Sequence, residues 1–212
     1  MKWHREMVGG LWDEIGLLQF NYLCQQGLLP SHYLLDIGCG SLRGGIHFIR
    51  FLENRHYFGI ERNQELLNAG VEYELKPQNL SNEPILRVME DFNFTVLEQQ
   101  FDFALAQSVF THLPWNSILR CLLNVRKVLK PTGKFFATFF EQGNPSVDTY
   151  LAPVQHQKED GGATVTQIDS DPFHYPFNVF HELAGRSGLQ VTYLGDWNHP
   201  RHQMMMQFAI SQ

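Results

Sequence analysis

The residues best suited to chemistry lie in the stretch DIGCG at 36–40 and at Glu61, which follows Gly40 by 21 positions. Gly38 and Gly40 let a backbone turn tightly and approach a bound molecule closely. A Gly-Gly pair at 44–45 opens a predicted helix, whose N-terminus favours a carboxylate or a phosphate. A carboxylate at position 61 can accept hydrogen bonds from both hydroxyls of an adenosine ribose. Together, the glycine turn and Glu61 predict a site for an adenosine-containing ligand. The alternatives are that the glycines form an ordinary strand-to-helix turn and that Glu61 is a solvated surface residue.

Other candidate residues follow two later strands of the predicted fold. Asp91 can accept a hydrogen bond from an exocyclic amine, and Phe92 can cover a flat base. The alternatives for this pair are helix capping and core packing. Gln107 and Ser108 end the fourth predicted strand, which has no carboxylate at that end.

Alternating strands and helices must position these residues. Short apolar strands separated by helices predict a parallel sheet covered on both faces, whose ligands bind outside the carboxyl ends of the strands. The connector at 195–203 is too short for a parallel crossover, so the last strand is expected to run antiparallel. The predicted strands are 33–37, 56–60, 85–89, 101–106, 134–140, 189–194 and 204–210, and the predicted helices are 7–27, 44–53, 64–75, 116–129 and 177–187.

Composition narrows the class of protein. The 212 residues suit a single domain, and 43% hydrophobic against 18% charged residues suit a packed core. A net charge of -6 without any basic run argues against nucleic-acid binding. Three scattered cysteines without CxxC spacing indicate reduced thiols. Because neither a signal peptide nor a long apolar run is apparent, we expect a cytoplasmic protein without a membrane partner.

Two flanking segments are expected to border the site within the single domain, 1–212. Residues 1–30 form a predicted helical cap with apolar residues at helical spacing, and we expect it to lie over the ligand as a lid. Residues 141–173 form a long polar insert on the substrate side. Within it, Tyr150–His156 and Ala163–Ile168 are candidates for a hairpin.

These motifs resemble those of the class I S-adenosyl-L-methionine (SAM)-dependent methyltransferase family. DIGCG resembles the family's first motif, E/D-x-G-x-G, and FGIERN resembles its second, with Glu61 as the ribose ligand. FDFALAQSVFTHL looks like the fourth motif, and LKPTGKFFATFF looks like the segment that leads into the fifth strand. The ending GLQVTYLGDWNHPRHQMMMQFAI is similar to the family's reversed terminal hairpin. The resemblance covers residues 33–140 and 174–210.

The resemblance implies a doubly wound α/β fold with a seven-stranded, mainly parallel sheet in the order 3-2-1-4-5-7-6, strand seven being antiparallel. It implies SAM as cofactor, with its methionine part beside the glycine turn and its adenine beside Asp91 and Phe92. Arg43 is a candidate partner for the methionine carboxylate, with a surface helix anchor as the alternative. The residues expected to contact the cofactor are Asp36, Gly38, Cys39, Gly40, Arg43, Glu61, Arg62, Asp91, Phe92 and Gln107.

Methyl transfer needs alignment of acceptor, methyl group and sulfur, and an acceptor hydroxyl also needs a base. Histidine is the usual base near neutral pH, and its position after a predicted strand makes His112, His174 or His199 a candidate. His202 follows the same strand as His199, but no third ligand for a metal is apparent. Some family members bind a metal through carboxylates after strand four. Because Gln107 and Ser108 stand there in this chain, a metal-independent reaction is expected.

The aromatic content and the insert after strand five favour a small molecule as acceptor, methylated at an oxygen or a nitrogen, and the acidic balance disfavours a nucleic acid. The expected oligomeric state is a monomer or a homodimer. The alternatives are a peptide or protein acceptor, and a SAM-binding domain without catalysis. A nicotinamide dehydrogenase is a third alternative, but it prefers G-x-G-x-x-G, and Arg43 stands at the third glycine position.

Overall fold

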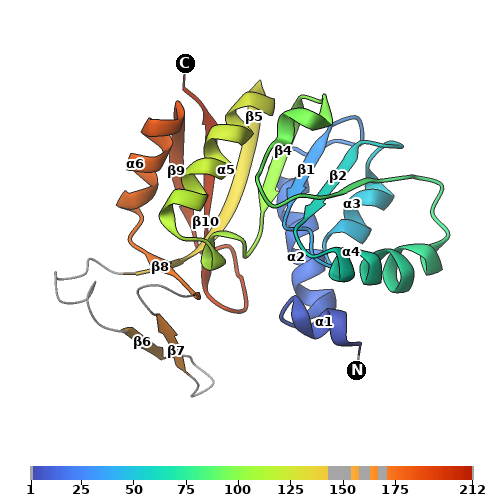
Figure 1. Cartoon of the computed structure of the whole chain (residues 1–212), viewed down its shortest axis with the longest axis horizontal. Helices are drawn as coiled ribbons and strands as arrows, with labels where there is room; N and C mark the ends of the chain where they lie inside the picture. The colour runs from blue at the N-terminus through green and yellow to red at the C-terminus, as the bar shows by residue number, and fades with distance from the viewer. Residues whose placement is uncertain (1, 143–153, 158–162, 167–170, 212) are drawn as a thin grey trace.

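The computed structural model describes residues 2–142, 154–157, 163–166 and 171–211. Its main sheet has the order β3-β2-β1-β4-β5-β10-β9, with helices on both faces (Figure 1). The strands β1 to β5 run parallel, and β10 runs antiparallel to both β5 and β9. The predicted strand order is therefore confirmed. These seven strands are β1 (Leu34–Ile37), β2 (Tyr57–Glu61), β3 (Ile85–Val88), β4 (Phe101–Ala106), β5 (Leu129–Glu141), β9 (Leu189–Gly195) and β10 (Gln203–Ile210).

The strand count differs from the prediction because an eighth short strand, β8 (His174–Tyr175), pairs in parallel with the end of β5. Within the insert, β6 (Val154–Gln157) pairs antiparallel with β7 (Ala163–Thr166) as a separate two-stranded sheet. The hairpin predicted for the insert is confirmed over residues 154–156 and 163–166. The remainder of its two predicted arms, 150–153 and 167–168, lies outside the described residues.

Two hydrophobic clusters fill the spaces between the sheet and its helices. Leu35 and Ile60 pack on one face with α5 (Trp115–Val128) and α6 (Asn178–Ser187). Leu34 and Tyr57 pack on the other, and the helices on that face are α2 (Trp12–Gln25), α3 (Gly45–Phe51) and α4 (Gln64–Gly70). Because side chains alternate between the faces of a strand, a central strand covered on both faces is buried along its whole length, as every residue of β1 and β2 is.

The predicted helix over 7–27 was wrong in its extent. The structure has α1 (Trp3–Met7) and then α2, separated by a turn at 8–11. Gly9, Gly10 and Leu11 adopt φ angles of 87°, 65° and 46°, which no helix allows. The two glycines make this turn accessible, although the apolar spacing continues across it.

Two other predicted elements differ in detail. The helix predicted over 64–75 is present, but its last five residues, Val71–Leu75, form a π-helix. A 3-10 turn, Lys76–Gln78, follows it and accepts proline in its first positions. The strand predicted from 134 begins at Leu129, because Leu129 pairs with Phe101 ahead of an irregularity in the ladder. Among the described residues, no helix is long and apolar enough to cross a membrane.

Candidate cofactor site

The glycine turn after β1 is fixed by its backbone. Gly38 and Gly40 have φ angles of 72° and 57°, which favour glycine. The amides of Gly38 and Cys39 both donate to the carbonyl of Ile60, at 2.8 and 3.0 Å, and so tie the turn to β2. A Cβ at Gly38 would lie 2.6 Å from Val109 Cγ2, so close packing also requires glycine there.

Glu61 ends β2 with its carboxylate at this turn. Its Oε2 accepts from the Gly40 amide at 3.0 Å, and its Oε1 accepts from the Asn63 amide at 2.9 Å. The side chain is only 8% exposed. The two residues that carry the sequence motif, Glu61 and Gly40, are thus brought into direct contact, and each carboxylate oxygen retains a further lone pair.

Asp36 and Cys39 lie in the same motif but their side chains are engaged inside the protein. The Tyr57 hydroxyl donates to Asp36 Oδ2 at 2.6 Å. Burial raises the pKa of Asp36 to about 7, although the bond from Tyr57 lowers it. Cys39 packs in the hydrophobic cluster beneath α3, and burial raises the pKa of its thiol. These side chains support the turn, and what they offer a ligand is their backbone.

Arg43 is a buried cation, 6% exposed, at the start of the helix after the turn. Its Nη1 donates to the carbonyls of Val8 and Gly10 at 2.8 and 2.9 Å, and its Nη2 donates to Gln107 Oε1 at 2.9 Å. Its Nε is buried and makes no hydrogen bond. Burial first, and then the charge of Arg201, lowers the pKa of Arg43 to about 10. A guanidinium held by neutral oxygens alone favours an anion beside it.

Gln107, at the end of β4, links Arg43 to a second group of polar side chains. Its Oε1 also accepts from Gln19 Nε2 at 3.3 Å, and its Nε2 donates to Ser108 Oγ at 2.6 Å. The same Nε2 lies 3.1 Å from His199 Nε2. The carboxyl ends of β1 and β4, helix α2 and the β9–β10 turn therefore meet in one buried polar cluster.

The segment after β3 lies beside Glu61, because the Met89 amide donates to the Glu61 carbonyl at 3.0 Å. Asp91 is exposed, and its Oδ1 accepts from the Asn93 amide at 3.0 Å. Phe92 is half-buried and packs against the hydrophobic cluster on the α5 side of the sheet. Arg62 is exposed next to Glu61. The structure thus brings the adenine candidates to the edge that holds the glycine turn.

The three candidate histidines have different surroundings. His112 is exposed, and its Nδ1 lies 2.6 Å from Asp171 Oδ2. His174 is buried in β8, where its ring stacks on Phe140 at a centroid distance of 4.8 Å. His199 is 2% exposed, and burial, followed by the nearby charges of Arg43 and Arg201, lowers its pKa to about 3. Of the three candidates, His112 is the exposed one, and its imidazole lies beside a carboxylate.

Several site residues were missed by sequence reasoning. Gln19 of α2 touches Gln107, and Val8 lies against the turn, since a Cβ at Gly40 would be 2.7 Å from Val8 Cγ1. Asp171 pairs with His112, which lies 59 positions earlier in the sequence, and no local sequence pattern predicts such a contact. Gly16 was a usable signal, because a glycine inside an amphipathic helix often marks a close approach, here to the Arg43 carbonyl.

Within the part of the chain that the structure describes, no group of three histidine, cysteine, aspartate or glutamate side chains is arranged to hold a metal ion.

Comparison with known proteins shows which of them share part of this sequence or this fold. Residues 35–135 match the family model described as a methyltransferase domain. The chain is similar to an S-adenosylmethionine-dependent methyltransferase from Clostridium acetobutylicum, with 11% identity, a TM-score of 0.66, and coverage of 93% of this chain and 91% of that one. It is also similar to the CcbJ methyltransferase from Streptomyces caelestis, with 13% identity, a TM-score of 0.68, and coverage of 93% and 90%. For the glycopeptide N-methyltransferase MtfA complexed with sinefungin, the identity is 16%, the TM-score 0.65, and the coverage 92% and 94%.

Proposed function

We propose that this chain is a SAM-dependent methyltransferase and that it methylates an oxygen or nitrogen of a small-molecule acceptor without a metal. The observation that carries the proposal is the glycine turn with Glu61 on one side and a buried, anion-seeking Arg43 on the other. The carboxylate of Glu61 can accept hydrogen bonds from the ribose hydroxyls of an extended cofactor, and the guanidinium of Arg43 can pair with the carboxylate of the same cofactor.

The residues at the edge of the sheet fit the parts of SAM. Glu61 has acceptor capacity left for the ribose, and Arg43 Nε is a donor without a partner for the methionine carboxylate. Asp91 Oδ2 and the half-buried side chain of Phe92 suit the amine and the flat ring of adenine. When bound, SAM supplies a methyl group that its sulfonium charge has already activated. The chain's task is then to align an acceptor and exclude water, which can lower a barrier by about 7–11 kcal/mol.

We assign the base, where the acceptor needs one, to His112. A proton on His112 Nδ1 donated to Asp171 leaves Nε2 free to accept the acceptor's proton. His199 suits this role less, because a pKa of about 3 makes it a weak base and burial keeps it from an acceptor. His174 is buried in β8 and suits an acceptor wall rather than proton transfer.

A titration with SAM and with NAD tests the proposal, using Glu61→Gln and, as a matched control, Glu65→Gln at an exposed position of α4. We expect the parent to bind SAM and not NAD, Glu61→Gln to bind SAM at least about ten-fold more weakly, and Glu65→Gln to bind like the parent. Failure of the parent to bind SAM, or equal affinity in Glu61→Gln, contradicts the assignment.

Turnover is tested separately by S-adenosylhomocysteine release with a panel of small hydroxyl and amine compounds. Peptides belong in the same panel, because MtfA, which shares the fold, is a glycopeptide N-methyltransferase. Release with peptides alone would replace the small-molecule acceptor by a peptide. SAM binding without release across the panel would favour a SAM-binding domain without catalysis.

A further inference from the structure

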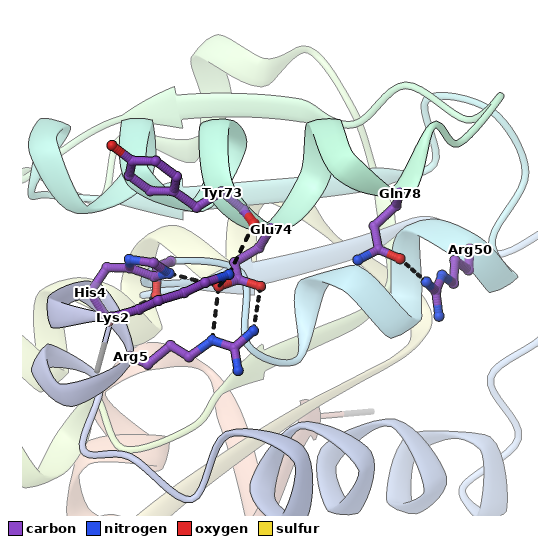
Figure 2. Close-up of polar contacts among 8 residues, drawn as sticks. Lys2, His4, Arg5, Arg50, Tyr73, Glu74 and Gln78 are labelled. Carbon is purple, nitrogen blue, oxygen red and sulfur yellow. Dashed lines mark hydrogen bonds and ion pairs between the residues drawn. The ribbon is translucent and has the colours of Figure 1, made fainter.

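A buried carboxylate on the α4 side of the protein holds the first residues of the chain. Glu74 is only 4% exposed, and all of its ion-pair partners lie within residues 2–5 (Figure 2). Its Oε1 lies 2.7 Å from His4 Nε2 and accepts from Arg5 Nε at 2.8 Å, and its Oε2 accepts from Arg5 Nη2 at 2.7 Å. Lys2 Nζ adds a bond to Oε1 at 3.2 Å. We name this group the Glu74 clamp.

The helix geometry aims Glu74 inward. Glu74 belongs to the π-helix Val71–Leu75, and such wide turns often occur at functional positions. Gly70, just before it, brings the helix against the glycine turn, since a Cβ there would lie 2.7 Å from the Ser41 backbone. Burial raises the pKa of Glu74, but hydrogen bonds from Arg5, His4 and Lys2 outweigh it and lower the pKa to about 2. The clamp therefore holds an ionised carboxylate.

Helix α1 depends on contacts with the rest of the protein. With five residues, it is far too short to be stable alone. The His4 ring stacks on Tyr73 at 5.5 Å, and the Arg5 guanidinium lies 4.6 Å from the centre of the Trp12 ring. Ser41 Oγ donates to the His4 carbonyl at 3.1 Å, which joins α1 to the glycine turn.

The clamp is connected to the cofactor site through residues 8–10, which follow α1 directly. Arg43 donates to the carbonyls of Val8 and Gly10, and Arg201 donates to that of Gly9. The Val8 side chain closes over Gly40. Whatever fixes α1 therefore also fixes the segment that borders Arg43 and the glycine turn.

From this connection we propose that Glu74 is a positioning residue for SAM binding, acting through residues 2–10 rather than through contact with the cofactor. The inference rests on the proposed function. If SAM binds tightly only when residues 8–10 are closed, its apparent affinity falls in proportion to the closed fraction. By reciprocity, bound SAM strengthens the closure of the same segment.

The test compares Glu74→Gln with Glu72→Gln, which removes an exposed carboxylate paired with Lys76 on the same helical stretch. We expect calorimetry to show at least about ten-fold weaker SAM binding for Glu74→Gln and less than about two-fold change for Glu72→Gln. Turnover at saturating SAM should stay near the parent's value, so that the loss appears in KM. Hydrogen exchange of residues 2–10 should quicken in Glu74→Gln and slow when SAM is added to the parent.

The outcomes are distinguishable. If the parent does not bind SAM, the proposed function fails. If the parent binds SAM, and a folded Glu74→Gln with faster exchange at 2–10 binds it equally well, the positioning role is overturned while the proposed function stands. If Glu74→Gln fails to fold, the same measurements are made on Arg5→Gln. This variant removes the partly exposed side chain that donates to both carboxylate oxygens of Glu74, and the same outcomes support or overturn the positioning role.

Discussion

At the scale of the residue, the guanidinium of Arg43 is the group whose chemistry is easiest to isolate. Arg43→Lys keeps the positive charge but cannot span two carbonyls and Gln107 while leaving a donor for a carboxylate. We expect SAM affinity to fall by at least about ten-fold, measured by calorimetry. Arg50→Lys, at an exposed position of α3, is the matched control and should bind normally. Unchanged affinity in Arg43→Lys would remove the methionine carboxylate from this residue.

A second residue-scale prediction concerns pH. Burial, followed by cationic neighbours, holds the pKa of His199 at about 3 in place of 6.5. Between these values the unfolded chain binds a proton that the folded chain does not, so the free energy of unfolding decreases as the pH falls below about 6.5. At pH 5 the decrease is about 2 kcal/mol. In His199→Gln this contribution is absent.

The measurement is the difference between parent and His199→Gln in urea unfolding at pH 7 and pH 5, with exposed His181→Gln as control. The pH dependence of the parent alone does not isolate the contribution of His199, because Asp36 changes the free energy of unfolding with pH in the opposite direction. Its raised pKa of about 7 means that the folded chain retains a proton that the unfolded chain loses, so its contribution grows as the pH falls. Parallel pH dependences for parent and His199→Gln would contradict the prediction.

Single residues were predicted well where the motif itself brings them together. The sequence placed Gly38, Gly40 and Glu61 at one turn because the two strand ends must be neighbours. It could not reveal that the Asp36 and Cys39 side chains turn inward, because side-chain direction depends on the packing of β1. It also could not find Asp171, whose contact with His112 depends on the path of the insert.

At the scale of the element, helix α2 approaches the glycine turn through Gly16. An added Cβ there would lie 2.6 Å from the Arg43 carbonyl, which is backbone and cannot move aside cheaply. We expect Gly16→Ala to lower the free energy of unfolding by about 1–3 kcal/mol and to weaken SAM binding. Urea unfolding and calorimetry measure the two effects.

Gly185 in α6 provides the control, because nothing lies within 4 Å of a Cβ built there. Gly185→Ala should stabilise the protein by up to about 1 kcal/mol, since alanine is the better helix former. If Gly16→Ala stabilises the protein to the same degree, the close approach of α2 to the turn is wrong.

Helices and strands were predicted most reliably where the spacing of apolar residues follows one period over the whole segment. Strand β4 and helix α5 were found to within one residue. The break between α1 and α2 was missed, because apolar spacing continues through Gly9 and Gly10 while the backbone does not. The π-helix at 71–75 was missed for a related reason, since its period differs from that of α4 only over one turn.

At the scale of the whole molecule, residues 2–10 belong to neither of the two hydrophobic clusters. Deleting residues 2–10 removes α1 and the turn but leaves α2, whose Leu23 is buried in the core. We expect a cooperative urea transition to remain and SAM affinity to fall by more than about ten-fold. A deletion variant that binds SAM as the parent does would show that this segment is no lid.

The bond between Glu61 and the Gly40 amide has a consequence for how the molecule moves. Because this carboxylate accepts a hydrogen bond from the turn in the free protein, the backbone at 38–40 is ordered by folding, before a ligand binds. A molecule that docks there loses its own freedom but demands little new ordering from the turn. NMR backbone order parameters of Gly38 and Gly40 should therefore be similar with and without the ligand. An increase in the order parameters on binding should be confined to the first ten residues.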